Sequence, residues 1–164
     1  MESMPSIKIS QEMLAQCFAL GVKAYPEEGC GVLSGPLEEP PLTNGVHPVE
    51  NIINRMHEED PERYPRTAER GYFMDPVEMM RLEKLFSAQE RKLKVIFHSH
   101  VDVGAYFSQE DIDRALWAGQ PILPGVAYLV CGIKNREPDG AILAWFDEQS
   151  GEFKTEPVES APGG

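Results

Sequence analysis

The sequence has few cysteines, a shortage of basic residues and no long apolar run. Its three cysteines, Cys17, Cys30 and Cys131, include no C-x-x-C pair, which argues against a disulfide framework or a cysteine-rich zinc site. The net charge of −12 argues against nonspecific nucleic-acid binding. No apolar run approaches the roughly 20 residues of a membrane span, and no signal-peptide pattern is visible. We therefore expect a cytoplasmic protein that binds neither nucleic acid nor membrane.

The length of 164 residues favours one domain with a substantial core, which we place at residues 1–150. Residues 151–164 are polar and contain proline, so we expect a flexible C-terminal tail. Strand and helix patterns are mixed without a regular βαβ rhythm, which predicts an α/β fold with a mixed β-sheet flanked by helices. Three helices are predicted. One runs from Ser10 to about Ala24, a second begins at Asp75, and a third runs from Ser108 through Gly119. The predicted strands are 31–34, 47–53, 72–74, 93–100, 125–133 and 141–147, with a long exposed loop at 55–70.

Two histidines follow the buried run of the strand predicted at 93–100. Alternation along a strand points His98 and His100 to one face and Ser99 to the other. Ser108 and Asp111 then begin a helix, so a carboxylate can join the two imidazoles around one ion. Three such ligands with a fourth position open are typical of a catalytic zinc site. Structural histidines are the alternative for the pair, and Ser-x-x-Asp alone is explained by a helix-capping box.

The spacing H-x-H-x7-S-x2-D resembles the JAMM (MPN+) motif of zinc metallopeptidases, which cut bonds to ubiquitin and ubiquitin-like proteins. Residues 26–33 read PEEGCGVL, which is similar to the family pattern P-x-E-x-C-G-x-L and aligns its glutamate with Glu28. The resemblance covers roughly residues 10–147. It implies the JAMM/MPN fold, a cytidine-deaminase-like α-β-α sandwich.

The resemblance also implies a role for each motif residue. His98, His100 and Asp111 would hold one Zn2+ per chain, Glu28 would be the general base, and Ser108 would donate a hydrogen bond to the developing oxyanion. Glu27 is the competing glutamate, and such a pair after a helix-ending proline is usually solvated. The motif selects Glu28 of the two.

Two positions depart from the family pattern. Val101 and Phe107 stand where many members have proline, so the loop between them should be less rigid. Tyr106 and Phe107 are candidate substrate-binding residues, with packing in the core or at the rim as the alternative. The charged loop 55–70 lies where deubiquitinating relatives carry a substrate-binding insertion, and a solvated loop explains it equally well.

The chain looks most like the stand-alone prokaryotic, Mec+-like branch. That resemblance implies hydrolysis of a peptide, isopeptide or cysteine-adduct bond at the Gly-Gly C-terminus of a ubiquitin-like or sulfur-carrier protein. A non-catalytic MPN scaffold that binds protein partners is the alternative, and a homodimer is left open. A zinc deaminase would need H-x-E together with P-C-x-x-C, and that combination is missing here. The chain itself ends in Gly163-Gly164, either as a flexible terminus or as a segment that enters an active site.

Overall fold

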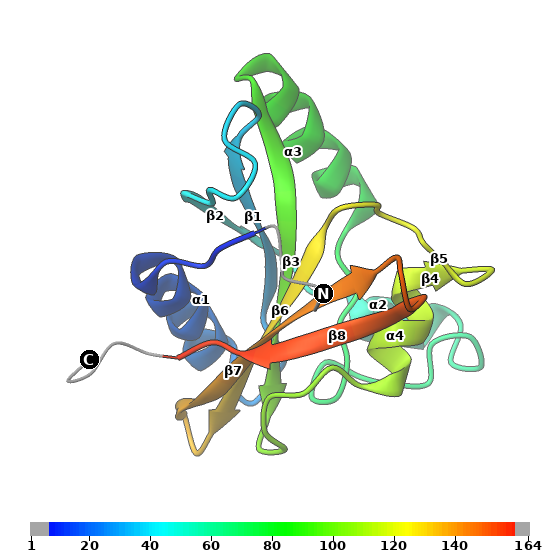
Figure 1. Ribbon diagram of the computed structural model, residues 1–164. Helices are drawn as coiled ribbons and strands as arrows, with labels where there is room; N and C mark the ends of the chain where they lie inside the picture. Colours follow the sequence, from blue (N-terminus) through cyan, green and yellow to red (C-terminus); the bar gives the residue numbers. More distant parts are fainter. Residues whose placement is uncertain (1–6, 160–164) are drawn as a thin grey trace.

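The computed structural model describes residues 7–159, in which one six-stranded sheet has helices on both faces (Figure 1). The predicted mixed sheet flanked by helices is thereby confirmed. Among residues 7–159, no helix has the length and apolar character needed to cross a bilayer. The elements are α1 (Gln11–Ala24), β1 (Cys30–Pro36), β2 (Gly45–Val49), α2 (Ile53–Glu59), α3 (Pro76–Ala88), β3 (Arg91–Val101), α4 (Gln109–Ala115), β4 (Leu116–Trp117), β5 (Gln120–Pro121), β6 (Ala127–Lys134), β7 (Glu137–Asp147) and β8 (Glu152–Pro157).

The sheet has the order β2-β1-β3-β6-β7-β8. The β3–β6 pair is parallel, and the other neighbours are antiparallel. β3 therefore lies inside the sheet with hydrogen-bonded neighbours on both sides, and residues 93–100 are buried throughout. A side chain at the end of β3 is therefore held by a buried strand that is paired on both sides, which resists local opening.

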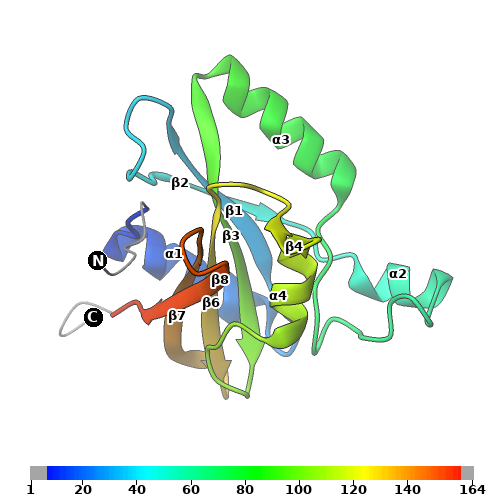
Figure 2. The ribbon, with the colours of Figure 1, turned by 45° about the vertical axis from the view of Figure 1, so that its right-hand side comes forward.

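Two apolar layers fix the sheet between helices. Ser10 caps α1 by accepting a hydrogen bond from the backbone N–H of Met13, as the sequence predicts. Figure 2 shows α1 on one side of the sheet and α3 and α4 on the other. The layer under α1 includes Leu14, Cys17, Phe18, Phe97 and Leu129, and the layer under α3 and α4 includes Leu82, Phe86, Ile96, Ala115 and Tyr128.

The segment between β2 and α3 differs from its prediction. The expected strand 47–53 ends at Val49, and the expected loop 55–70 begins inside the helix α2. Asn51 explains the break, because its Oδ1 accepts hydrogen bonds from the backbone N–H groups of Ile53 and Phe73. Its Nδ2 donates to the carbonyl oxygens of Glu28 and Gly71. In place of the expected strand 72–74 there is a single bridge between Asn51 and Met74.

The helix that begins after Ser108 is shorter than predicted. α4 ends at Ala115, and a tight β4–β5 hairpin follows instead of a helix through Gly119. Ala118 and Gly119 at its turn have φ of 52° and 79°. A two-residue hairpin with positive φ at both central positions favours glycine, which Gly119 supplies.

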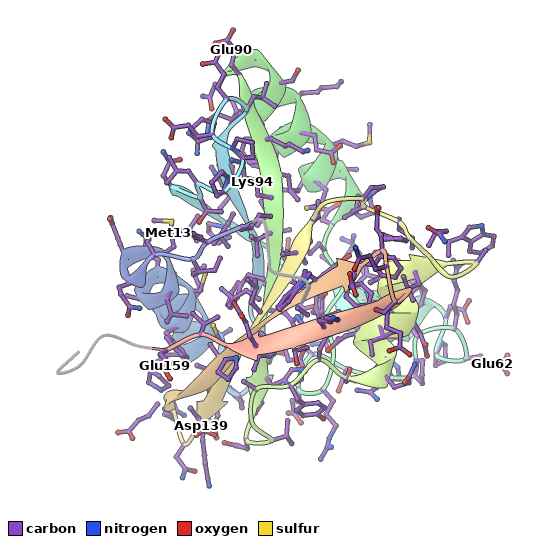
Figure 3. All side chains as sticks on the ribbon, in the orientation of Figure 1. Met13, Glu62, Glu90, Lys94, Asp139 and Glu159 are labelled. Carbon is purple, nitrogen blue, oxygen red and sulfur yellow. The ribbon has the colours of Figure 1, made fainter. Side chains whose placement is uncertain are left out.

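The predicted flexible tail is wrong for residues 152–157, which form β8, the edge strand that pairs with β7. The physical reason is Phe153, whose ring packs against Phe107, Tyr128 and Phe146 at centroid distances of 5.0, 5.9 and 5.5 Å. The chain then returns to α1, where Gln11 Nε2 donates to the carbonyl of Glu159 at 2.6 Å. Figure 3 labels Glu159 beside this helix. The Gly163-Gly164 prediction lies outside the described residues.

The role of β8 is testable with Phe153→Ala. Removing a fully buried phenylalanine costs about 3–5 kcal/mol, and because Phe153 is half-buried we expect about 1.5–3 kcal/mol. In a domain of this size that loss lowers the Tm by about 3–12 °C. The control is Trp117→Ala, because Trp117 is 79% exposed and its loss should have little effect. Equal thermal unfolding of Phe153→Ala and wild type would show that residues 152–157 do not stabilise the domain.

Candidate metal centre

Two imidazoles project from the carboxyl end of β3. His98 and His100 are 0% and 6% exposed and lie on the face covered by α4, as strand alternation predicts. Ser99 lies on the opposite face, where its Oγ accepts a hydrogen bond from the backbone N–H of Gly29 at 2.8 Å. That bond ties the start of β1 to the histidine-bearing end of β3.

The carboxylate comes from the first turn of α4. Ser108 Oγ accepts from the N–H of Asp111, and Asp111 Oδ2 accepts from the N–H of Ser108, both at 3.0 Å. This capping box is the structural role that the sequence allowed for these two residues. The same Oδ2 lies 3.4 Å from His98 Nε2 and 3.6 Å from His100 Nε2. The cap therefore aims the carboxylate at the histidines, so the capping role of Asp111 is compatible with its predicted role as a metal ligand.

The three side chains have the spacing of a metal-ligand set. The two Nε2 atoms are 3.2 Å apart, which completes a triangle with edges of 3.2, 3.4 and 3.6 Å. Ligands bound tetrahedrally at about 2.0–2.1 Å are about 3.3–3.4 Å from one another. His98, His100 and Asp111 thus form a group that can hold a metal ion.

The pKa shifts of His98 and Asp111 also suit a cation. Burial lowers the pKa of His98, which favours the neutral ring that can donate a lone pair. Burial raises the pKa of Asp111, but the nearby rings of His100 and His98 outweigh that effect and hold the pKa well below its ordinary value. A neutral imidazole beside an ionised carboxylate has the donor chemistry of a divalent-cation site.

The loop after β3 orients His100. His100 Nδ1 lies 3.1 Å from the carbonyl oxygen of Gly104, so the ring N–H can donate there while Nε2 faces Asp111. Gly104 has φ of 85°, a conformation that suits glycine. Tyr106 packs edge-on against the His100 ring at a centroid distance of 4.7 Å.

Glu28 lies in the same cavity as these groups. The cavity has a volume of about 610 Å³, and its lining includes Glu28, His100, Ser108 and Asp111. Glu28 is 7% exposed, and its backbone N–H donates to the carbonyl of Ala68 at 2.7 Å. Burial raises the pKa of Glu28 to about 7, against the opposing effect of His100. A carboxyl group with that pKa can both take up and release a proton near neutrality.

Glu27 is placed differently from its neighbour. Its Oε2 accepts a hydrogen bond from Asn54 Nδ2 at 3.1 Å, and its side chain is exposed. Glu27 is not part of the cavity lining, whereas Glu28 is. Of the two candidate glutamates, the structure therefore brings Glu28 to the histidines and Asp111.

The two candidate substrate-binding residues lie in different environments. Tyr106 is 49% exposed and lines the cavity, so its role as a substrate contact stays a prediction. Phe107 packs against Tyr128 and Phe153 at 5.3 and 5.0 Å and is not among the lining residues. Neighbouring residues of an extended loop face opposite ways, which turns Phe107 into the apolar layer. Packing, the alternative for Phe107, is what the structure supports.

Several cavity residues were not identified from the sequence. Tyr72 stacks on the ring of His98, and Arg66, Arg70 and Arg114 are part of the lining. Arg66 Nε pairs with Glu110 on α4 at 2.6 Å, which links the segment after α2 to the helix that carries Asp111. The charged stretch 55–70 was the available signal, but charge alone does not say which of its residues face inward.

A mixed sheet with histidines on an inner strand and an aspartate on the adjoining helix is an α/β domain with a group that can hold a metal ion. The chain belongs to the family of prokaryotic homologs of the JAB domain, a JAMM/MPN family whose profile matches residues 10–146. With the His-His-Asp group, this membership indicates a metallohydrolase.

Solved structures support the fold. A protein from Desulfitobacterium hafniense has a TM-score of 0.62 and 20% identity, with 93% of this chain and 89% of that chain covered. A protein from Salinibacter ruber has a TM-score of 0.61 and 23% identity, with coverage of 96% and 93%. The search of curated proteins gave no match.

Proposed function

We propose that this chain is a zinc-dependent hydrolase that cleaves a peptide, isopeptide or cysteine-adduct bond at the Gly-Gly C-terminus of a ubiquitin-like or sulfur-carrier protein. One observation carries the proposal: Glu28, a separate buried carboxyl group, lines the same cavity as His100 and Asp111, two members of the three-residue metal group. A non-catalytic scaffold needs no carboxyl group with a pKa near 7 beside such a group. When bound, zinc lowers the pKa of a coordinated water and polarises the scissile carbonyl.

Three residues around the metal group have separate roles in the proposed reaction. The Glu28 carboxylate accepts a proton from the attacking water and returns it to the leaving nitrogen. Ser108 Oγ accepts a hydrogen bond from the N–H of Asp111, which leaves its own O–H to donate to the charge that develops on the carbonyl oxygen. Tyr106 at the cavity wall borders the path of the entering chain.

The size of the cavity supports an extended tail as the substrate. A volume of about 610 Å³ is that of a small-molecule pocket and cannot admit a folded domain. The scissile bond must therefore lie on a flexible segment outside the body of the partner. Glycines suit such a segment because they lack side chains that would clash with the walls near the metal group.

A panel of defined substrates tests this function. A Gly-Gly-ending ubiquitin-like carrier would be supplied with a C-terminal cysteine, with an isopeptide-linked lysine, and with Ala-Ala in place of Gly-Gly. We expect the zinc-loaded chain to release cysteine or lysine from the Gly-Gly forms, with at least a hundredfold lower kcat/KM for Ala-Ala. Chelation should stop the release, and added zinc should restore it. Binding of the carrier without cleavage of any form would favour the scaffold instead.

Ser108→Ala separates capping from catalysis. Loss of an N-cap serine costs about 0.5–2 kcal/mol of stability, and loss of an oxyanion donor lowers kcat about 10²–10³-fold. The matched control is Ser10→Ala, because Ser10 caps α1 through the same kind of bond to Met13. We expect both variants to melt earlier than wild type and only Ser108→Ala to lose turnover. Equal turnover of the two variants would remove Ser108 from the mechanism.

A further inference from the structure

The two histidines of the metal group are supported differently. His100 uses the carbonyl of Gly104 as the acceptor for its second ring nitrogen. His98 Nδ1 is buried, and among residues 7–159 it has no hydrogen-bond partner. Metal-binding histidines usually donate that N–H to an acceptor, which fixes the plane of the ring. Because no hydrogen bond at Nδ1 fixes the plane of the His98 ring, another contact must do so.

An aromatic ring occupies the position next to His98. Tyr72 stacks on the imidazole with a centroid distance of 4.4 Å and an interplanar angle of 22°. A near-parallel contact of this kind restricts tilting of the imidazole, because tilting would drive it into the tyrosine ring or separate the two faces.

Arg114 ties this ring to the helix of the third ligand. Its guanidinium carbon lies 5.1 Å from the centroid of Tyr72, and its Nη1 donates to the carbonyl oxygen of Tyr72 at 2.6 Å. Arg114 follows Asp111 by three residues on α4, and both line the cavity. Movement of α4 therefore affects the tyrosine as well as the carboxylate.

Asn51 holds the backbone on both sides of Tyr72. It donates to the carbonyl oxygen of Gly71 at 3.1 Å and accepts from the N–H of Phe73 at 3.0 Å. Its amide also donates to the carbonyl oxygen of Glu28 at 3.0 Å, so the same side chain anchors the proposed base. Tyr72 thus stands on a fixed backbone rather than on a loose loop.

We propose that Tyr72, fixed by Asn51 and Arg114, is the positioning residue for His98 and replaces a hydrogen-bond acceptor with a stacked ring. The inference rests on the proposed metal site and adds to it a source of metal affinity outside the three ligands. Tyr72 does not touch the ion. It reduces the freedom that the His98 imidazole loses when an ion binds.

Zinc affinity of the purified full chain, measured by competition with a chromogenic chelator, tests this role. We expect Tyr72→Leu to weaken zinc binding about 10–100-fold, as loss of a histidine-orienting partner does in other sites. Tyr72→Phe keeps the ring and should stay within about threefold of wild type. Arg114→Met, an exposed substitution that leaves the core intact, should weaken binding about two- to fivefold.

Tyr64→Leu is the matched control, because it removes a tyrosine of the same segment that packs edge-on against Phe73 and lies beneath Arg63. It should leave zinc affinity unchanged even if it lowers the thermal stability of the metal-free chain. Tight zinc binding by the wild type with equal affinity in Tyr72→Leu and Arg114→Met would overturn the stacking role alone. A Tyr72→Leu variant that fails to fold leaves Arg114→Met to decide. A wild type that binds no zinc would overturn the metal site itself, and the stacking role with it.

Discussion

Asp111→Ala should lose zinc binding almost completely and hydrolysis with it. Asp111 Oδ2 faces the Nε2 atoms of both histidines at 3.4 and 3.6 Å, so its removal leaves only the two imidazoles as the ligand set. Since loss of a supporting partner alone costs 10–100-fold in affinity, we expect loss of a ligand to cost at least about 10³-fold. Elemental analysis after gel filtration, together with chelator competition, measures the effect.

Asp113→Ala is the control for this substitution. Asp113 lies on the same helix and its Oδ1 accepts from Gln109 Nε2 at 2.8 Å, but it is not in the metal group. It should bind zinc as the wild type does. Asp111→Ala with unaltered zinc content would place the ion elsewhere in the chain.

Glu28→Gln should retain zinc and lose hydrolysis. Glu28 is not among the three ligands, so the ion should stay, while the amide cannot carry the proton that the reaction moves. A general base contributes about 10²–10⁴-fold, and kcat should fall by that factor with little change in zinc stoichiometry. The measurements are turnover of the Gly-Gly carrier and zinc content on the same preparation.

The neighbouring glutamate provides the comparison. Glu27→Gln makes the same chemical change one residue earlier, on a side chain that hydrogen-bonds Asn54 outside the cavity lining. Its kcat should remain within about twofold of wild type, as for a surface substitution away from the site. If Glu27→Gln were the inactive variant and Glu28→Gln the active one, the assignment of the base would be reversed.

The metal group was predictable because its signals are local. Alternation along a strand places His98 and His100 on one face, and a Ser-x-x-Asp helix start places Asp111 on the first turn. What the sequence does not encode locally is the meeting of β3 and α4, which the JAMM resemblance supplied. Glu28 likewise depended on the motif, because periodicity does not distinguish it from Glu27.

The supporting residues could not be predicted because their contacts join distant parts of the chain. Tyr72 meets His98 only when the segment before α3 folds over the end of β3, and Arg114 reaches Tyr72 from another helix. Lys94 is a similar case on β3: it is buried, and its Nζ donates to the carbonyls of Pro36, Glu39 and Leu42. Polar partners of this kind follow from tertiary structure rather than from composition.

The predicted helix and strand boundaries were wrong where the contacts of a few side chains outweighed the local sequence pattern. α2 is short and charged and buries little besides Ile53, so it shows no apolar periodicity to detect. β8 consists largely of polar residues and is held by one aromatic residue, Phe153, that meets partners from β6, β7 and the loop before α4. A polar segment with one such aromatic residue is predicted to be flexible from its sequence, because the residues that the aromatic ring contacts are not known.

The metal site is tested most directly by X-ray absorption at the zinc edge on the purified wild-type chain. The predicted result is one zinc per chain with nitrogen and oxygen ligands at about 2.0–2.1 Å, including two imidazoles. The spectrum of His98→Ala should show one imidazole fewer, which would identify His98 as a zinc ligand. A sulfur ligand at about 2.3 Å, or a purified chain that retains no zinc when supplied with it, would contradict the site.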